Sequence, residues 1–173
     1  MTTYVLAGGC FWCLDSAYSQ FKGISDVTCG YTGGSLENPS YERVCDGDTN
    51  HAEVVSITFD ESEITKTDIL DIFFTIHDPT QLNRQGGDIG TQYRSAMFYQ
   101  DENQKQDFLQ AVERAKEVWG DSIVTEVAEL GKFWPAEQYH QDFFEKNPNQ
   151  GYCVAVVAPK VSKARSKFTH LLK

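Results

Sequence analysis

Short apolar runs and helix-spaced apolar residues alternate along the chain. The runs predict strands over 4–7, 24–31, 54–59, 95–99 and 124–130. Helices are expected over 11–21, 65–76, 102–119, 137–144 and 161–172. Strands and helices mix without strict βαβ alternation. We therefore expect an α+β fold, with a mixed or largely antiparallel sheet and helices packed against it.

Polar stretches separate these elements. Segments 33–50 and 82–93 carry glycines and are expected to be loops. Thr65 or Thr67 is expected to cap the helix that ends before Pro79.

The bulk composition fits one globular domain over residues 1–173. Hydrophobic residues make up 40% of the chain and aromatic residues 13%, which a disordered chain would not have. No run of about 18 apolar residues predicts a membrane span. The N-terminus has neither a basic region nor a long apolar run, so no secretory signal is expected and we predict a cytoplasmic protein.

The net charge of −10 argues against a nucleic-acid-binding protein, which would need a basic surface. The end of the chain is nevertheless basic, and segment 161–172 is expected to be a basic terminal helix. We interpret it as a solvated helix face that could meet an acidic partner. The basic residues that follow Pro159, with no acid among them, are Lys160, Lys163, Arg165, Lys167 and Lys173.

Five cysteines, Cys10, Cys13, Cys29, Cys45 and Cys153, occur in a chain without an export signal. The odd count favours reduced thiols over a disulfide scaffold. Cys29 and Cys45 are interpreted as structural.

Cys10 and Cys13 belong to GGCFWC, where a predicted strand gives way to a predicted helix. The free N–H groups of a helix N-terminus favour a thiolate there. A zinc site would need two more ligands at matching spacing, and the chain has none. A buried inert pair, a redox dithiol and a nucleophile beside an apolar pocket stay open. Phe11 and Trp12 favour the pocket, because they are too apolar for a simple electron relay.

Each polar residue that could assist such a nucleophile is a weak candidate when it is taken alone. Tyr41 and Tyr93 lie in the two polar loops, and Glu53 opens a strand. The four histidines, His51, His77, His140 and His170, are interpreted as structural.

Seven segments in order change this assessment. They are GGCFWC (8–13), GYTGG (30–34), PSYERVC (39–45), HAEVV (51–55), GTQYRSA (90–96), AEQYHQ (136–141) and KNPNQGYC (146–153). Together they resemble the methionine sulfoxide reductase A family, the peptide-methionine (S)-S-oxide reductases, over roughly residues 4–153. The resemblance implies an α/β sandwich around a mixed, ferredoxin-like sheet.

The resemblance also implies roles for individual residues. Cys10 matches the family's nucleophile, and Phe11 and Trp12 match its pocket for the substrate methyl group. Glu53 matches its acid, and Tyr41 and Tyr93 match the tyrosines that donate hydrogen bonds to the sulfoxide oxygen. Asp88 matches the aspartate that opens its DxGTQY stretch. The reaction would reduce the S epimer of methionine sulfoxide, free or in oxidised proteins, and so repair them. Cys10 would become a sulfenic acid, a second thiol would form a disulfide with it, and thioredoxin or a similar dithiol would reset the enzyme. No cofactor, metal, nucleic acid or membrane is implied, and we expect a monomer.

Cys13 and Cys153 are the two candidate resolving cysteines. Cys13 stands where many members have glycine, and Cys153 matches a cysteine that many members carry near the C-terminus. We favour Cys153, on a segment (146–158) expected to be mobile, with Cys13 in a relay step. Asn50 replaces the glycine common before HAE, which bears on the conformation of that loop.

Three other functions remain as alternatives. A thioredoxin-like dithiol oxidoreductase would use Cys10 and Cys13 without any sulfoxide. A binding module would hold methionine-like side chains without turnover. A cysteine hydrolase would need a histidine base such as His51, but no hydrolase motif surrounds Cys10.

Overall fold

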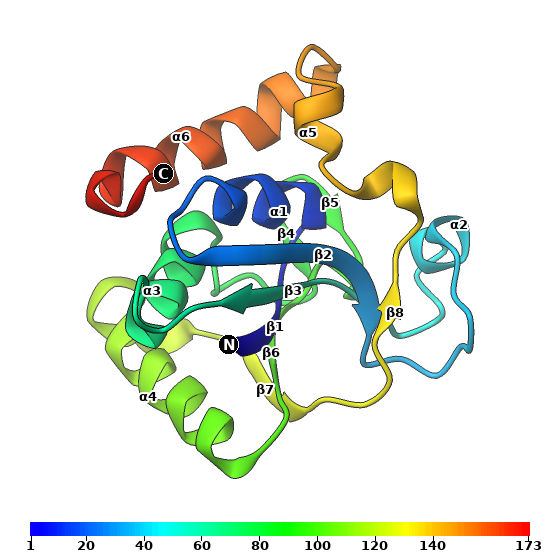
Figure 1. Cartoon of the computed structure of the whole chain (residues 1–173). Helices are drawn as coiled ribbons and strands as arrows, with labels where there is room; N and C mark the ends of the chain where they lie inside the picture. Colours follow the sequence, from blue (N-terminus) through cyan, green and yellow to red (C-terminus); the bar gives the residue numbers. More distant parts are fainter.

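A six-stranded sheet forms the centre of the protein, in a computed structural model that describes all 173 residues (Figure 1). Its strand order is β7-β6-β1-β3-β2-β8. The strands are β1 (Thr2–Gly8), β2 (Ile24–Thr32), β3 (Ala52–Phe59), β6 (Ser95–Tyr99), β7 (Glu126–Glu129) and β8 (Trp134–Pro135). All neighbouring strands are antiparallel except β6 and β7, which are parallel. The predicted mixed, largely antiparallel sheet is confirmed.

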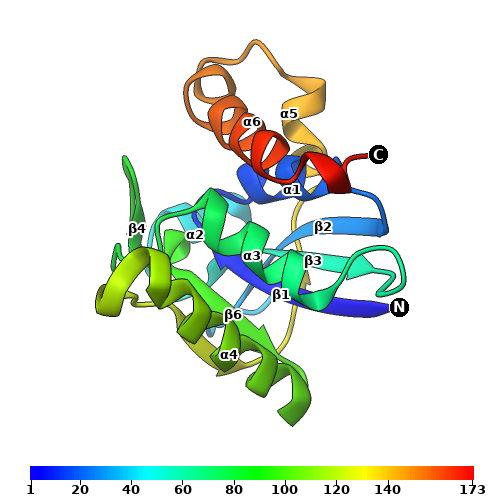
Figure 2. The same cartoon turned by 90° about the vertical axis from the view of Figure 1, so that its left-hand side faces the viewer.

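The core of the fold is a βαββαβ unit. Helices α1 (Phe11–Ser19) and α3 (Lys66–Ile76) connect β1 to β2 and β3 to β6, and the four strands lie in the order β6-β1-β3-β2. This is the ferredoxin-like arrangement. The helices lie over one face of the sheet, with α4 (Glu102–Trp119) beside α3 (Figure 2).

Alternation along β1 gives each face of the sheet its own core. Tyr4 and Leu6 point into the main cluster of 28 buried residues between sheet and helices. Val5 and Ala7 point to the other face and join a cluster of six buried residues. Because both faces are covered, β1 reads as one apolar run in the sequence.

The two polar stretches hold short elements. Helix α2 (Tyr41–Cys45) lies in the first and is capped by Ser40, whose Oγ accepts the Arg43 N–H at 3.2 Å. The second forms a hairpin of β4 (Arg84–Gln85) and β5 (Asp88–Ile89), followed by a 3-10 turn (Thr91–Tyr93). Elements this short carry too few residues for a periodic pattern.

The C-terminal part differs from the expected single helices. Segment 137–144 is a 3-10 turn (Gln138–His140) and helix α5 (Phe143–Lys146), separated by Asp142 with φ of +56°. Helix α6 (Ala158–Lys167) begins before the predicted start at 161 and ends before 172. A π-helical turn (Cys153–Val157) leads directly into it, and α6 packs across α1 (Figure 1).

Candidate active site

Cys10 sits at the junction of β1 and α1, as the sequence predicts. It is the N-cap residue of α1, with extended backbone angles. Gly9 makes the turn before it with φ of +86°, and a Cβ there would lie 2.7 Å from the Gln85 side chain. Only glycine fits this turn, which fixes the position of Cys10.

The thiols of Cys10 and Cys13 lie against each other. Burial raises the pKa of the Cys10 thiol well above its usual value, and the hydrogen bond that this thiol donates to Cys13 raises it further. Accepting that bond lowers the pKa of Cys13. Burial therefore outweighs the helix N-terminus at Cys10.

Glu53 is buried beside this pair, at the start of β3. The Phe11 backbone N–H donates to its Oε1 at 3.1 Å, while its buried Oε2 has no hydrogen-bond partner. Burial raises the pKa of the Glu53 carboxyl to about 8. A carboxyl with this pKa holds its proton at neutral pH and can donate it.

Aromatic rings form a wall next to Cys10. The Trp12 ring stacks on Phe143 with centroids 3.8 Å apart and an interplanar angle of 5°. The Trp12 indole N–H donates to Nδ1 of His140 at 3.0 Å. Phe11 also packs against His140, with ring centroids 5.0 Å apart. The two predicted pocket residues are thus held by partners from segment 140–143.

The two predicted tyrosines meet near Glu53. Tyr41 packs against His140 with ring centroids 4.3 Å apart. Burial, followed by the charge of Glu53, raises the pKa values of both Tyr41 and Tyr93. Both hydroxyls are also within hydrogen-bond reach of the Cys45 thiol. Both phenols therefore stay neutral donors close to the carboxyl.

Asp88 faces the C-terminal segment. Its carboxylate accepts a hydrogen bond from the Tyr152 hydroxyl, and its negative charge contributes to the raised pKa of Glu53. The Tyr152 ring also packs edge-on against Trp12, with centroids 5.8 Å apart.

Cys153 lies in the same small cluster as Cys10 and Cys13, together with Val157. Its side chain is fully buried, and burial, followed by the nearby Cys13, raises its pKa. The structure therefore brings both candidate resolving cysteines to Cys10, and all five thiols are free.

Several of the residues interpreted as structural make hydrogen bonds to the backbone or lie in the core. His51 accepts the Gly34 N–H at 3.0 Å, and His77 bonds the Phe73 carbonyl and Ser95. Cys29 is buried in the main core, whereas Cys45 is exposed and reaches the two tyrosines. Asn50 has φ of +62°, a left-handed conformation that asparagine tolerates in place of glycine.

Sequence reasoning missed His140, Phe143 and Tyr152 as site residues. His140 was assigned a structural role, but it accepts the Trp12 indole N–H. His140 and Tyr152 lie in the AEQYHQ and KNPNQGYC segments, which were matched as whole motifs, whereas Phe143 lies in neither segment.

Asp15 is a further buried carboxyl, one turn along α1 from Cys10. It accepts the Asp142 backbone N–H at 2.8 Å and so holds the residue before Phe143. Burial raises its pKa to about 7.

No group of three or more His, Cys, Asp or Glu side chains is arranged to bind a metal ion. None of the helices combines the length and the apolar character that crossing a membrane would need.

Comparisons with known proteins show which family the chain belongs to. A family model described as peptide methionine sulfoxide reductase matches residues 2–172. The chain is 55% identical over 173 residues to the peptide methionine sulfoxide reductase MsrA of Clavibacter michiganensis, covering 100% of this chain and 99% of that protein. It is 51% identical to the MsrA of Acinetobacter baumannii with the same coverage.

Solved structures give the same result. Reduced Mxr1 from Saccharomyces cerevisiae superposes with a TM-score of 0.83 at 38% identity, covering 88% of each chain. Methionine sulfoxide reductase A of Corynebacterium diphtheriae gives 0.80 at 34% identity, covering 88% of this chain and 77% of that one. The chain belongs to the peptide methionine sulfoxide reductase A family and is an oxidoreductase.

Proposed function

We propose that the protein reduces the S epimer of methionine sulfoxide, free and in oxidised proteins, with Cys10 as the nucleophile. The observation that carries this proposal is the buried Glu53 carboxyl, which is bonded to the Phe11 N–H, one residue after Cys10. A proton donor with a pKa of about 8 beside a cysteine suits the removal of a sulfoxide oxygen.

The first step transfers the oxygen. The Cys10 sulfur attacks the sulfoxide sulfur and Glu53 protonates the oxygen, which passes to Cys10 as a sulfenic acid while methionine leaves. The proton of the Cys10 thiol returns Glu53 to its acid form. The substrate sulfur gains two electrons and the Cys10 sulfur loses them. Tyr41 and Tyr93 would donate hydrogen bonds to the oxygen. Asp88 would hold the surrounding loop.

The aromatic wall supports selectivity for one epimer. Trp12 and Phe11 would contact the methyl group, while the polar donors would face the oxygen. Exchanging the two substituents would place oxygen against the Trp12 ring and leave the buried donors unpaired. Selectivity for S rather than R is the family's preference.

For the second step, the geometry favours Cys13 as the first resolving thiol, ahead of Cys153. Cys13 lies three residues from Cys10 and is buried in the same cluster, so its thiol can reach a Cys10 sulfenic acid without movement of the C-terminal segment. The products are a Cys10–Cys13 disulfide and water. Cys153, in the same cluster, would then attack Cys13 or Cys10 and take over the disulfide.

Reduction by a dithiol would close the cycle, and thioredoxin is the candidate. Mxr1 from Saccharomyces cerevisiae has been solved in complex with Trx2, and that chain superposes at 24% identity. Transfer to thioredoxin would proceed through a mixed disulfide. That the protein works as a cytoplasmic monomer without a cofactor stays a prediction.

One measurement tests this scheme. The reduced protein is given the S sulfoxide of N-acetylmethionine without reductant, the methionine product is counted, and the disulfide is mapped by mass spectrometry. We expect about one product molecule per enzyme from Cys153→Ser, with a Cys10–Cys13 bond, and up to about two from wild type, because exchange of the disulfide to Cys13–Cys153 frees Cys10 for a second turnover.

The other outcomes are informative. A Cys10–Cys153 bond in wild type with little product from Cys153→Ser would make Cys153 the direct resolving thiol. Bound sulfoxide with no sulfenic acid on Cys10 would indicate a binding module. No product and no binding would reject the reductase, and a dithiol oxidoreductase using Cys10 and Cys13 would replace it.

A further inference from the structure

A groove far from the thiols runs between α3, α4 and α6. Its volume is about 420 Å³, which is within the range of small-ligand sites. It shares no residue with the active site. Along the helical segment that ends in α6, Lys163 comes ten residues after Cys153, a separation of about 15 Å at helical rise.

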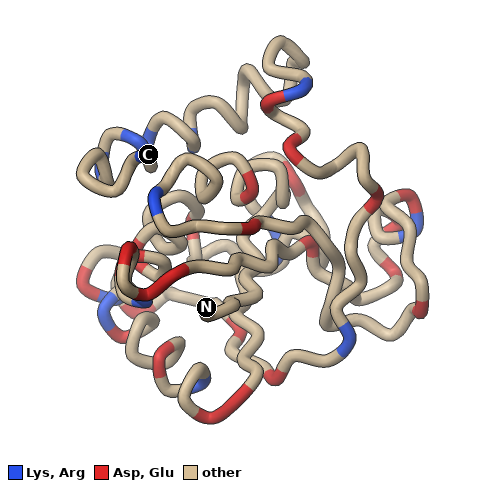
Figure 3. Tube along the Cα trace, viewed as in Figure 1, with Lys and Arg blue, Asp and Glu red and all other residues tan.

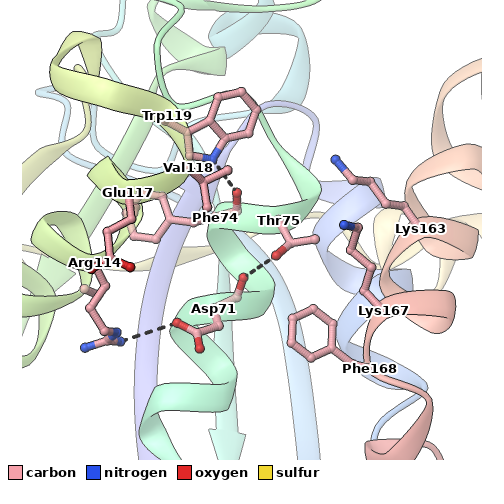
Figure 4. Close-up of a pocket in the computed structure, with 12 residues that line it drawn as sticks. Asp71, Phe74, Thr75, Arg114, Glu117, Val118, Trp119, Lys163, Lys167 and Phe168 are labelled. Carbon is pink, nitrogen blue, oxygen red and sulfur yellow. Dashed lines mark hydrogen bonds and ion pairs between the residues drawn. The ribbon is translucent and has the colours of Figure 1, made fainter.

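One wall of the groove is cationic. Lys163 and Lys167 lie one turn apart on α6, and both ammonium groups point into the groove (Figure 4). Neither has a carboxylate within 4.0 Å, unlike Arg114 on the opposite wall, which pairs with Asp71 at 3.5 Å. Two like charges at this spacing repel each other when nothing neutralises them.

The rest of the groove is largely apolar. The rings of Phe74, Trp119 and Phe168 line it, and the Trp119 indole N–H is already used on the Phe74 carbonyl at 2.9 Å. Val118 at the edge is 81% exposed. A bound apolar group would remove this surface from water at about 25 cal/mol per Å².

The charges of the lining favour an anion on the α6 side. Of its two carboxylates, Asp71 pairs with Arg114, and Glu117 projects from α4 on the side of Arg114 (Figure 4). No Asp or Glu follows Glu145 in the sequence, so α6 is free of acids in a chain of net charge −10 (Figure 3).

We propose that this groove binds an amphipathic monocarboxylate, a free medium-chain carboxylate with an apolar tail. The carboxylate lies between Lys163 and Lys167, and the tail lies along Phe74, Trp119 and Val118. Such a ligand joins α6 to α3 and α4. This binding site is separate from methionine sulfoxide reduction and does not depend on the proposed mechanism.

The test is a titration of the ¹⁵N-labelled full chain with sodium decanoate below its micelle concentration, followed by NMR. We expect saturable shifts of the Trp119 indole N–H and of the Lys163, Lys167 and Thr75 amides. Lys163→Gln/Lys167→Gln should weaken binding about tenfold, and Val118→Asp, at an exposed site, should also weaken it.

Control variants and control ligands test whether the two groove lysines and the carboxylate are what binding requires. Arg165→Gln/Lys173→Gln removes two charges from the same segment outside the groove and should leave the affinity within about twofold. Decanol and decyltrimethylammonium should bind more weakly than decanoate. Three outcomes would overturn the proposal. They are an equal loss of decanoate affinity in both double variants, chemical-shift changes outside the groove, and binding only to phosphatidylglycerol vesicles.

Discussion

Glu53 is the buried carboxyl to which we assign the proton transfer in the proposed reaction. Glu53→Gln keeps its shape but has no proton to give, so the single-turnover rate of sulfoxide reduction should fall by about 10² or more. In wild type the rate should fall as pH rises through about 8, because Glu53 then loses its proton. Rapid-quench measurements of methionine formation from pH 6 to 9 check both expectations. A near-wild-type rate in the variant across this range would remove Glu53 from the acid role.

The stability of the same variant gives an independent check. The pKa of Glu53 is raised from 4.5 to about 8, so the folded protein keeps a proton that the unfolded chain releases within this window. Its contribution to the free energy of unfolding is therefore lost as pH rises from about 4.5 to 8. Glu53→Gln should match wild type near pH 4.5 and be more stable above pH 8. Because Asp15 also titrates near pH 7, only the difference between the two proteins isolates Glu53.

His140 keeps Trp12 in place by accepting its indole N–H at 3.0 Å. His140→Leu removes this acceptor, which is worth about 1 kcal/mol, so KM for methionine sulfoxide should rise about fivefold with little change in kcat. The matched control is His170→Leu, at an exposed histidine near the C-terminus. Equal kinetics for the two variants would mean that the Trp12 contact does not shape the pocket.

The sequence motifs predict which residues come together at Cys10, but not the contacts that hold them there. Cys10, Glu53 and Tyr93 converge as the motifs imply. The role of His140 was invisible, because a histidine in a loop has no periodic signal, and its partner Trp12 is 128 positions away. Likewise, burial reverses the thiolate preference expected for Cys10 at a helix N-terminus.

At the scale of elements, α3 has a clear start signal. The Thr65 side chain accepts the Asp68 N–H at 3.0 Å, and the Asp68 carboxylate accepts the Thr65 N–H at 3.2 Å, which makes a capping box. Thr65→Ala should lower the free energy of unfolding by about 1 kcal/mol, or Tm by about 2–4 °C. Thr67→Ala, the other candidate cap, lies inside the first turn and should be nearly neutral in a thermal melt. Equal losses would contradict the capping role.

Strong periodicity explains which elements were predicted. Helix α4 has the predicted bounds, since Phe108, Ala111 and Ala115 form a buried stripe along 18 residues. The prediction of one helix over 137–144 is wrong, because Asp142 adopts a left-handed conformation and its N–H donates to the Asp15 carboxylate. A tertiary contact of this kind leaves no trace in local spacing.

At the scale of the whole molecule, the C-terminal segment is held at both ends. Near the thiols, Cys153 and Val157 are buried against Cys10 and Cys13. At the far end, the Leu171 carbonyl accepts the Lys22 N–H at 2.8 Å, and the Leu171 side chain joins the main core. The expected mobility of 146–158 thus requires release of contacts along α6.

Leu171→Ala should loosen this segment selectively. Removing a buried leucine side chain costs about 2–5 kcal/mol, and this loss falls on the anchor of α6, not on the central strands. Amide exchange over 151–167 should therefore accelerate by about 30-fold or more, while β3 amides change less. Cys153 should react faster with iodoacetamide than in wild type, whereas Cys29 should not. Leu109→Ala, at a position 40% exposed on α4, is the control and should leave both rates unchanged. If the amides of β3 and α6 accelerate together, the C-terminal segment unfolds only with the whole domain, and the disulfide exchange that we propose for Cys153 must then occur within the packed thiol cluster.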